Sequence, residues 1–232
     1  MNPQIQLPRY YLPRPPLDLD TATIAAFDSL WAQMTSGAHG HELPYSLPVP
    51  RWQFLCYLTD HKPVVLHGSG NPDVAVFEPR QAADIMTFGN RAAVYAAADG
   101  IWPIYFAILD RDRYAMSLTN SCIRIATPTG ETSDPFYFFS ISQSARMHQP
   151  WRTGTVYILP RATFEPQPPI PSGGATIHVL QCASPLPVTP IAKLRVTPDD
   201  FPFLDQIRGH DDQLQMQRAR ANPDAFPWVD DD

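Results

Sequence analysis

Proline restricts the fold of this chain more than any other residue. It occupies 27 of the 232 positions, about twice its average usage of ~5%. Proline fixes φ, lacks an N–H donor and pushes the preceding residue toward an extended conformation. The chain is therefore expected to have short elements joined by stiff, extended connections, and a helical bundle is excluded. Because 44% of residues are hydrophobic and only 17% are charged, we expect a packed core rather than a disordered chain.

The negative charge is concentrated at the C-terminal end. The formal net charge is −6, and residues 198–232 hold nine Asp against three Arg, so this segment accounts for all of it. The rest of the chain is balanced, with fourteen acidic and fourteen basic residues. No basic field is present to hold a nucleic-acid backbone.

The cysteines and the apolar runs indicate the compartment. Cys56, Cys122 and Cys182 are far apart and have no metal-ligand spacing, and an odd number does not suit a disulfide framework. The N-terminal residues lack the apolar run of a signal peptide, and no apolar stretch is long enough to cross a membrane. We expect a cytoplasmic protein without a membrane partner.

The first half of the chain is expected to hold most of the helices. Asp20 precedes a run whose apolar residues recur at helical spacing, which predicts a capped helix over 21–34. Proline-rich residues 1–19 and 36–50 are expected to be extended arms. Further helices are predicted over 51–59, 80–87 and 100–109, and strands over 63–69 and 92–97.

The second half is expected to be mostly β-structure. Short segments rich in branched or aromatic residues, bounded by Pro, Gly or Asp, predict strands. Pro166 to Gly174 is expected to be a structureless loop, and the residues after Phe203 a loosely held helix with a frayed end. Helices followed by strands point to the α+β class. The strands are predicted over 121–127, 136–142, 155–159, 175–182 and 191–196.

Two motifs carry functional chemistry. In the first, LHGSG, His67 ends an apolar strand and is followed by Gly68 and Ser69, so a side chain with ring nitrogens lies beside backbone that a ligand can approach closely. In the second, residues 88–107, Tyr95 lies on a short strand and Tyr105 on the following helix. Two tyrosines at one pocket can stack on a flat aromatic ring. Taken alone, the first motif also fits a tight turn with an incidental histidine. The second also fits two aromatic residues of the core.

Together the motifs resemble the ADP-ribosyltransferase superfamily, in the poly(ADP-ribose) polymerase and diphtheria-toxin branch with a His-Tyr-Glu core. The resemblance is clear over 64–107 and looser to about Val196. It implies a core of two packed sheets with short flanking helices. His67 would hold the nicotinamide ribose, Gly68 the nicotinamide amide, and Tyr95 and Tyr105 the nicotinamide ring, with Ser69 as the small residue of the turn. NAD would be the co-substrate, and no metal is implied.

The third family position, a glutamate on a late strand, has no direct counterpart. Gln181 is the candidate on the strand itself, and it can hydrogen-bond a hydroxyl without supplying negative charge. Glu165 is the nearest acid, before the 166–174 loop. By the resemblance, the missing glutamate bears most on elongation of a poly(ADP-ribose) chain, less on transfer of a single ADP-ribosyl group, and least on NAD binding.

Other polar residues offer further candidates for the site. Arg80, Arg91 and Arg152 are candidates to clamp a pyrophosphate, and Asn90 with Arg91, in the turn beside the expected pocket, are the better ones. His39, His41 and Glu42 are interpreted as a surface loop rather than a metal site. Asp110 to Arg113 is interpreted as a solvated turn, and Trp102 as either core or pocket wall.

These observations divide the chain into a Pro-rich and helical extension over 1–61, a catalytic domain over 62–207 and an acidic tail over 208–232. The expected function is NAD-dependent mono-ADP-ribosyl transfer, a glycosyltransferase reaction on a bacterial-toxin-like fold, to a macromolecular acceptor whose class stays open. Oligomeric state stays open too. Alternatives are a catalytically silent module that binds NAD or ADP-ribose, RNA 2′-phosphate transfer, and an interaction protein in which the motifs are coincidental.

Overall fold

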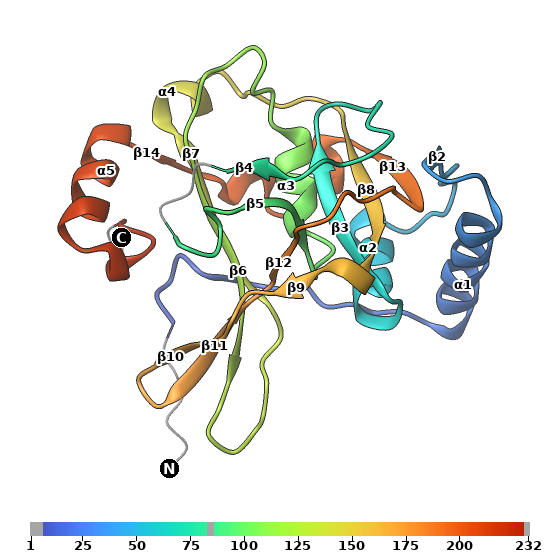
Figure 1. Ribbon diagram of the computed structural model, residues 1–232, viewed down its shortest axis with the longest axis horizontal. Helices are drawn as coiled ribbons and strands as arrows, with labels where there is room; N and C mark the ends of the chain where they lie inside the picture. Colours follow the sequence, from blue (N-terminus) through green and yellow to red (C-terminus); the bar gives the residue numbers. More distant parts are fainter. Residues whose placement is uncertain (1–6, 83–85, 230–232) are drawn as a thin grey trace.

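The computed structural model describes residues 7–82 and 86–229 and has mixed α+β architecture with two sheets (Figure 1). The α+β class expected from the sequence is confirmed. Five α-helices occur in the described ranges: α1 (Thr21–Ser36), α2 (Arg51–His61), α3 (Trp102–Ile108), α4 (Gln143–Arg146) and α5 (Asp212–Ala221). No helix in these ranges is long and apolar enough to cross a membrane.

The first sheet has six strands among the described residues. Its order is β1 (Leu12–Pro13), β7 (Phe136–Ser142), β6 (Leu118–Ala126), β11 (Ala175–Val179) and β10 (Ile170–Ser172), with β14 (Arg208–His210) also pairing with β7. Most neighbours are antiparallel, but β14 runs parallel to β7.

The second sheet has eight strands in the same ranges. Its order is β2 (His41–Glu42), β13 (Ala192–Val196), β8 (Gly154–Pro160), β3 (Val64–Ser69), β5 (Ala92–Ala97), β12 (Gln181–Ser184) and β9 (Glu165–Pro166), with β4 (Arg80–Gln81) on β5. The motif strands β3 and β5 are therefore neighbours near its centre, and β5 also pairs with β12.

Proline explains why several strands are so short. Pro13, Pro166 and Pro171 lie in β1, β9 and β10, which are the end strands of the two sheet orders. Proline has no N–H for a ladder and is confined to such edge positions. Short strands with proline therefore stand at both ends of the first sheet order and at one end of the second.

Helix α3 lies between the two sheets and joins their cores. It packs on β3 and β8 of the second sheet, and the Tyr105 ring lies 4.9 Å from the ring of Phe139 on β7 of the first. Contact is closest at Gly68, where a Cβ would come 1.8 Å from the carbonyl oxygen of Pro103. Gly154 on β8 is equally constrained, with Ala107 oxygen at 1.9 Å. Two glycines on neighbouring strands therefore seat the helix.

The structure corrects three local predictions. Arg80 and Gln81 form strand β4 rather than the start of a helix over 80–87, since they pair with Ala92 and Ala93; residues 83–85 lie outside the described ranges. The strand expected over 175–182 is two strands, because the chain passes from the first sheet to the second at Leu180.

The third correction concerns the loop over 166–174. Residues 170–172 pair with residues 175–177 of β11 as a hairpin rather than forming a structureless loop. Gly173 and Gly174 have φ of 54° and 85°, and two consecutive positive φ values make the tight turn that joins such strands. The GG pair in the sequence is the signal for this hairpin.

The C-terminal segment is tied to the first sheet through His210. Its Nε2 lies 2.7 Å from the Ser117 hydroxyl and its Nδ1 lies 2.7 Å from the Ser140 hydroxyl. The Asp212 carboxylate accepts hydrogen bonds from Ser117 and Ser142. This network, which we call the His210 network, fixes the start of α5 against β7 and against the residue that precedes β6.

Candidate functional site

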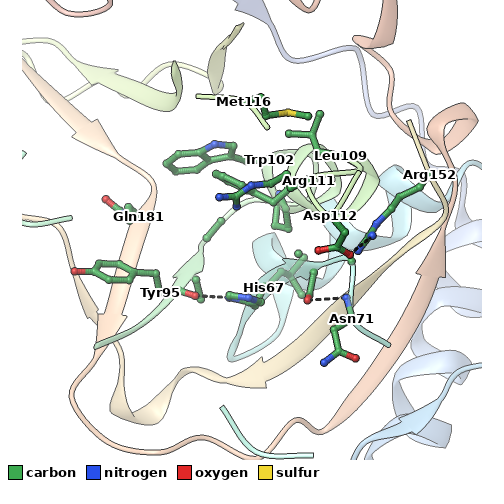
Figure 2. A pocket seen from close by; sticks show the side chains of 18 of the residues that line it. His67, Asn71, Tyr95, Trp102, Leu109, Arg111, Asp112, Met116, Arg152 and Gln181 are labelled. Carbon is green, nitrogen blue, oxygen red and sulfur yellow. Dashed lines mark hydrogen bonds and ion pairs between the residues drawn. The ribbon is translucent and has the colours of Figure 1, made fainter. Parts of the chain in front are cut away.

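A cavity of about 750 Å³ opens where β3, β5 and β12 meet α3 (Figure 2). Five of the nine residues selected from the sequence line it: His67, Gly68, Ser69, Tyr95 and Gln181. Tyr105, Asn90, Arg91 and Glu165 do not. The volume lies in the usual range for small-molecule sites, roughly 300–1,000 Å³.

His67 is held in one orientation and one tautomer. Its Nδ1 is 2.6 Å from the backbone oxygen of Tyr95, and a carbonyl only accepts hydrogen bonds, so Nδ1 carries the proton and Nε2 keeps its lone pair. The ring of Phe77 lies 4.6 Å away and supports the imidazole. Burial lowers the pKa of His67, and the hydrogen bond to Tyr95 offsets part of that effect. The imidazole is therefore a neutral hydrogen-bond acceptor at pH 7.

Gly68 and Ser69 shape the base of the cavity. The missing side chain of Gly68 lets the backbone of β3 reach the carbonyl of Pro103 on α3. The Ser69 hydroxyl accepts a hydrogen bond from the N–H of Asn71 at 3.0 Å and so fixes the turn after the strand.

Tyr95 and Gln181 lie on paired strands at one side of the cavity. Tyr95 is opposite Ala183 and Gln181 is opposite Ala97 in the β5–β12 register. The Tyr95 hydroxyl accepts from the N–H of Arg91 at 2.8 Å and lies 3.1 Å from the carbonyl oxygen of Phe88. With its hydroxyl held in this way, Tyr95 offers its ring rather than its oxygen to a ligand.

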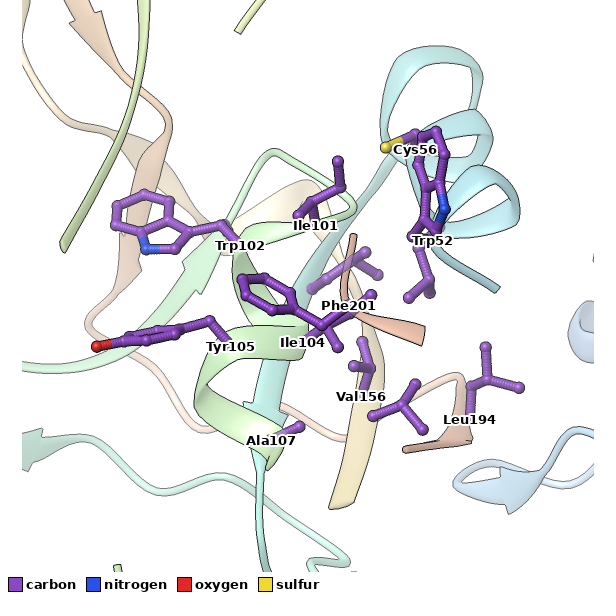
Figure 3. Packing of buried hydrophobic residues seen from close by; sticks show 14 of the residues in the cluster. Trp52, Cys56, Ile101, Trp102, Ile104, Tyr105, Ala107, Val156, Leu194 and Phe201 are labelled. Atoms are coloured by element: carbon purple, nitrogen blue, oxygen red, sulfur yellow. The ribbon is translucent and has the colours of Figure 1, made fainter. Parts of the chain in front are cut away.

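Tyr105 lies in the core instead of the cavity. It lies among the buried hydrophobic residues (Figure 3). It has no exposed surface, and its hydroxyl donates to the carbonyl of Ser140 at 2.9 Å. Each helical residue turns by about 100°, so Trp102, Pro103 and Phe106 face the cavity and Tyr105 turns toward the first sheet. Trp102, which the sequence left as either core or pocket wall, therefore lines the cavity, and Phe106 is the aromatic residue that the sequence analysis missed. Their i, i+4 spacing was the available signal.

Asp99 fixes the N-terminal end of α3. One carboxylate oxygen accepts the N–H groups of Ile101 and Trp102, each at 2.8 Å, and the other accepts the hydroxyl of Tyr137 at 2.7 Å. Burial raises the pKa of this carboxyl, although all three hydrogen bonds lower it in part. The Trp102 indole also donates to Asn120 at 2.6 Å, so the aromatic wall of the cavity is fixed at both ends.

The other predicted residues form a separate exposed group. Arg91 stacks on the ring of Phe88 at 4.3 Å and lies 3.8 Å from the carboxylate of Glu165, which is 68% exposed. Asn90 accepts a hydrogen bond from Gln81. Of the two candidates for the third family position, Gln181 is inside the cavity and Glu165 is outside it.

The end of the cavity beyond Ser69 is charged, and of its residues the sequence indicated only Arg152, as a candidate to clamp a pyrophosphate. Arg111, Asp112 and Arg152 line it (Figure 2). Arg152 is 2.6 Å from Asp112 and 3.5 Å from Asp110. Of the residues interpreted as a solvated turn, Asp110 is partly buried and residues 111–113 are exposed, but Arg111 and Asp112 also belong to the cavity wall.

Comparison with protein-family models, with curated proteins and with solved structures found no match to this chain. The described residues contain no cluster of three or more His, Cys, Asp or Glu side chains suited to a metal ion. His41 lies in the short strand β2, and its Nδ1 is 2.7 Å from the carbonyl oxygen of Ala38.

Proposed function

We propose that this chain binds NAD in the cavity and transfers its ADP-ribosyl group to an acceptor, as a mono-ADP-ribosyltransferase. The supporting observation is that His67, Tyr95 and Gln181 come from distant parts of the chain and meet at one cavity. This supports the proposal because a coincidental motif would have no reason to assemble beside a cavity of ligand size.

Each residue has a defined role in the proposal. The free Nε2 of His67 accepts a hydrogen bond from a ribose hydroxyl, since its Nδ1 is bound to Tyr95. The rings of Tyr95 and Trp102 provide the apolar walls for nicotinamide, and each such aromatic contact contributes roughly 0.5–1.5 kcal/mol. Gln181, beside Tyr95 in the sheet, donates to or accepts from a second hydroxyl.

The proposed reaction breaks the bond between nicotinamide and ribose. Nicotinamide departs with the bonding electron pair, and the ribose carbon becomes an oxocarbenium-like centre. The acceptor nucleophile then forms the new bond to that carbon and loses its proton. Fixed dipoles stabilise such a centre in a site that excludes water. Because Gln181 is neutral, it gives less stabilisation than a carboxylate, which favours slow single transfers.

A second candidate is a silent module that binds NAD or ADP-ribose without cleaving it. Gln181 supports this candidate because it replaces charge with a neutral amide. Asp112, a carboxylate that lines the cavity, lies 2.6 Å from Arg152 at the charged end, and it is not on the strands that carry His67, Tyr95 and Gln181.

Nicotinamide release from NAD, measured with and without a cell lysate, tests both candidates. Transfer predicts release by the wild type, loss of release in His67→Ala and in Tyr95→Ala, and full release in His39→Ala, an exposed histidine outside the cavity. Thermal shift with NAD on the same samples separates the candidates, since a ligand of the native state must stabilise it. A thermal shift without nicotinamide release supports the silent module. If NAD causes no thermal shift and no nicotinamide is released, both candidates are refuted.

A further inference from the structure

The charged end of the cavity centres on Arg152. Its backbone N–H donates to the carbonyl of Ile108 at 2.8 Å, which ties it to the end of α3. Its guanidinium lies against Gly70, where a Cβ would come 1.3 Å from a terminal guanidinium nitrogen. The glycine therefore leaves the space that Arg152 occupies.

The guanidinium of Arg152 is partly unsatisfied. Its Nε is buried and has no hydrogen-bond partner among residues 7–82 and 86–229. Its ion-pair partners in this part of the chain are Asp112 at 2.6 Å and Asp110 at 3.5 Å, both through the same terminal nitrogen. Arginine binds phosphate and carboxylate through a fork of two donors, so a larger anion can use donors that Asp112 leaves unused.

The Asp112 carboxylate can be displaced from Arg152 by another anion. Its side chain is 83% exposed, and in the described ranges it contacts no charged group other than Arg152. The Arg152 side chain is 24% exposed, so one partner of this ion pair lies in solvent, and such a pair contributes little to stability and is readily exchanged. Arg111, next to it, lines the same cavity, and its guanidinium has no hydrogen-bond or ion-pair partner among the described residues.

We propose that Arg152 and Arg111 form a subsite for a phosphate-bearing ligand, and that the Asp112 carboxylate occupies this subsite until the ligand displaces it. The ligand group is the diphosphate of NAD, an identity that rests on the proposed function; the exchange of Asp112 for an anion rests on the contacts alone. Asp112 thus acts as an internal competitor for the anion.

A second pocket with cationic residues adjoins the cavity at Gly70. Gly70 also borders a second, smaller pocket of about 170 Å³, which is lined by Lys193 and Arg195 together with Glu42. Lys193 donates to the carbonyl of Pro72 and lies 3.9 Å from Asp73. Arg195 is exposed, with no ion pair in the described part of the chain. Gly70 therefore borders both the cavity that Arg152 lines and a second pocket that holds two cations and one carboxylate.

Binding of inorganic pyrophosphate, measured by calorimetry at low salt, tests the exchange. Asp112→Asn removes the competing carboxylate and is expected to tighten binding about five-fold, the change that loss of one exposed ion pair allows. The matched control is Asp134→Asn, because Asp134 is 73% exposed and pairs with Arg14 at 3.0 Å away from the cavity. Arg152→Gln should abolish binding, whereas Arg113→Gln, a neighbouring arginine outside the cavity lining, should retain it.

Three outcomes would overturn the proposal. Equal affinity of the Asp112→Asn and Asp134→Asn variants removes the competition. Equal binding of malonate removes the phosphate class. Failure of pyrophosphate to reduce the thermal shift by NAD removes the NAD diphosphate as the ligand.

These readouts do not depend on turnover. Tighter pyrophosphate binding by Asp112→Asn without any NAD binding would leave the anion subsite standing and refute the proposed function. Nicotinamide release by the wild type, together with unchanged pyrophosphate binding by Asp112→Asn, would support the proposed function and refute the exchange at the anion subsite.

Discussion

Replacing Gly68 with alanine tests whether the seating of α3 on β3 supports the fold. The added Cβ would lie 1.8 Å from the carbonyl oxygen of Pro103 and 2.8 Å from its carbonyl carbon, both backbone atoms. A carbon approaches a carbonyl oxygen to about 3.3 Å, so helix and strand would have to separate by about 1.5 Å. No side-chain rotation can relieve this contact.

The expected cost is large. Overpacking a filled core costs typically 1–3 kcal/mol, and a backbone clash between a buried helix and a central strand belongs at the upper end, so we predict about 3 kcal/mol. Such a loss is a substantial part of the ~5–15 kcal/mol that stabilises a typical protein. For a chain of this size it corresponds to a fall in Tm of about 9 °C.

Urea unfolding of Gly68→Ala beside Gly70→Ala gives the measurement. At Gly70 the atoms nearest to the new Cβ belong to the flexible end of Arg152, which can swing away with loss of its ion pairs to Asp112 and Asp110, so we predict a cost of about 1 kcal/mol, well below that of Gly68→Ala. A Gly68→Ala free energy of unfolding within 1 kcal/mol of the wild type would refute the close seating of α3.

Two further predictions concern Tyr105 and the His210 network. Tyr105→Phe should cost about 1 kcal/mol of stability for the lost hydrogen bond to Ser140 yet leave any thermal shift by NAD unchanged, because the ring lies outside the cavity; a reduced shift would contradict this placement. Burial lowers the pKa of His210 although Asp212 raises it in part, so the unfolded chain binds the proton more readily and the free energy of unfolding should fall as pH drops below about 6.5. Urea midpoints at pH 7.5 and 5.5 check this, and His210→Gln should flatten the dependence; an equal slope would rule His210 out.

Local patterns predicted most of the elements near the site. Asp20 accepts the N–H of Thr23 at 2.7 Å, as expected for a helix cap. The helix beginning at Arg51 and the strands carrying His67 and Tyr95 also form where their apolar patterns indicate. These signals succeed because capping and periodicity depend on residues a few positions apart.

Predictions that depended on distant residues were less successful. The break at Leu180 exists because the two ends of one apolar run join different sheets, which no local pattern encodes. Tyr105 and Trp102 are both aromatic residues on α3, and only the position of the first sheet decides which of them faces the cavity. The contact between Asp112 and Arg152 likewise arises because Trp151 pairs with Leu109 in an isolated bridge.

The order of strands in the second sheet has a kinetic consequence. Gln181 reaches the cavity only when β12 has paired with β5, and closing so long a stretch of chain is slower than forming local helices such as α1 and α2. During refolding, helical signal should therefore appear while the cavity still lacks one wall. A ligand that requires Gln181 would report completion of the sheet rather than collapse of the chain.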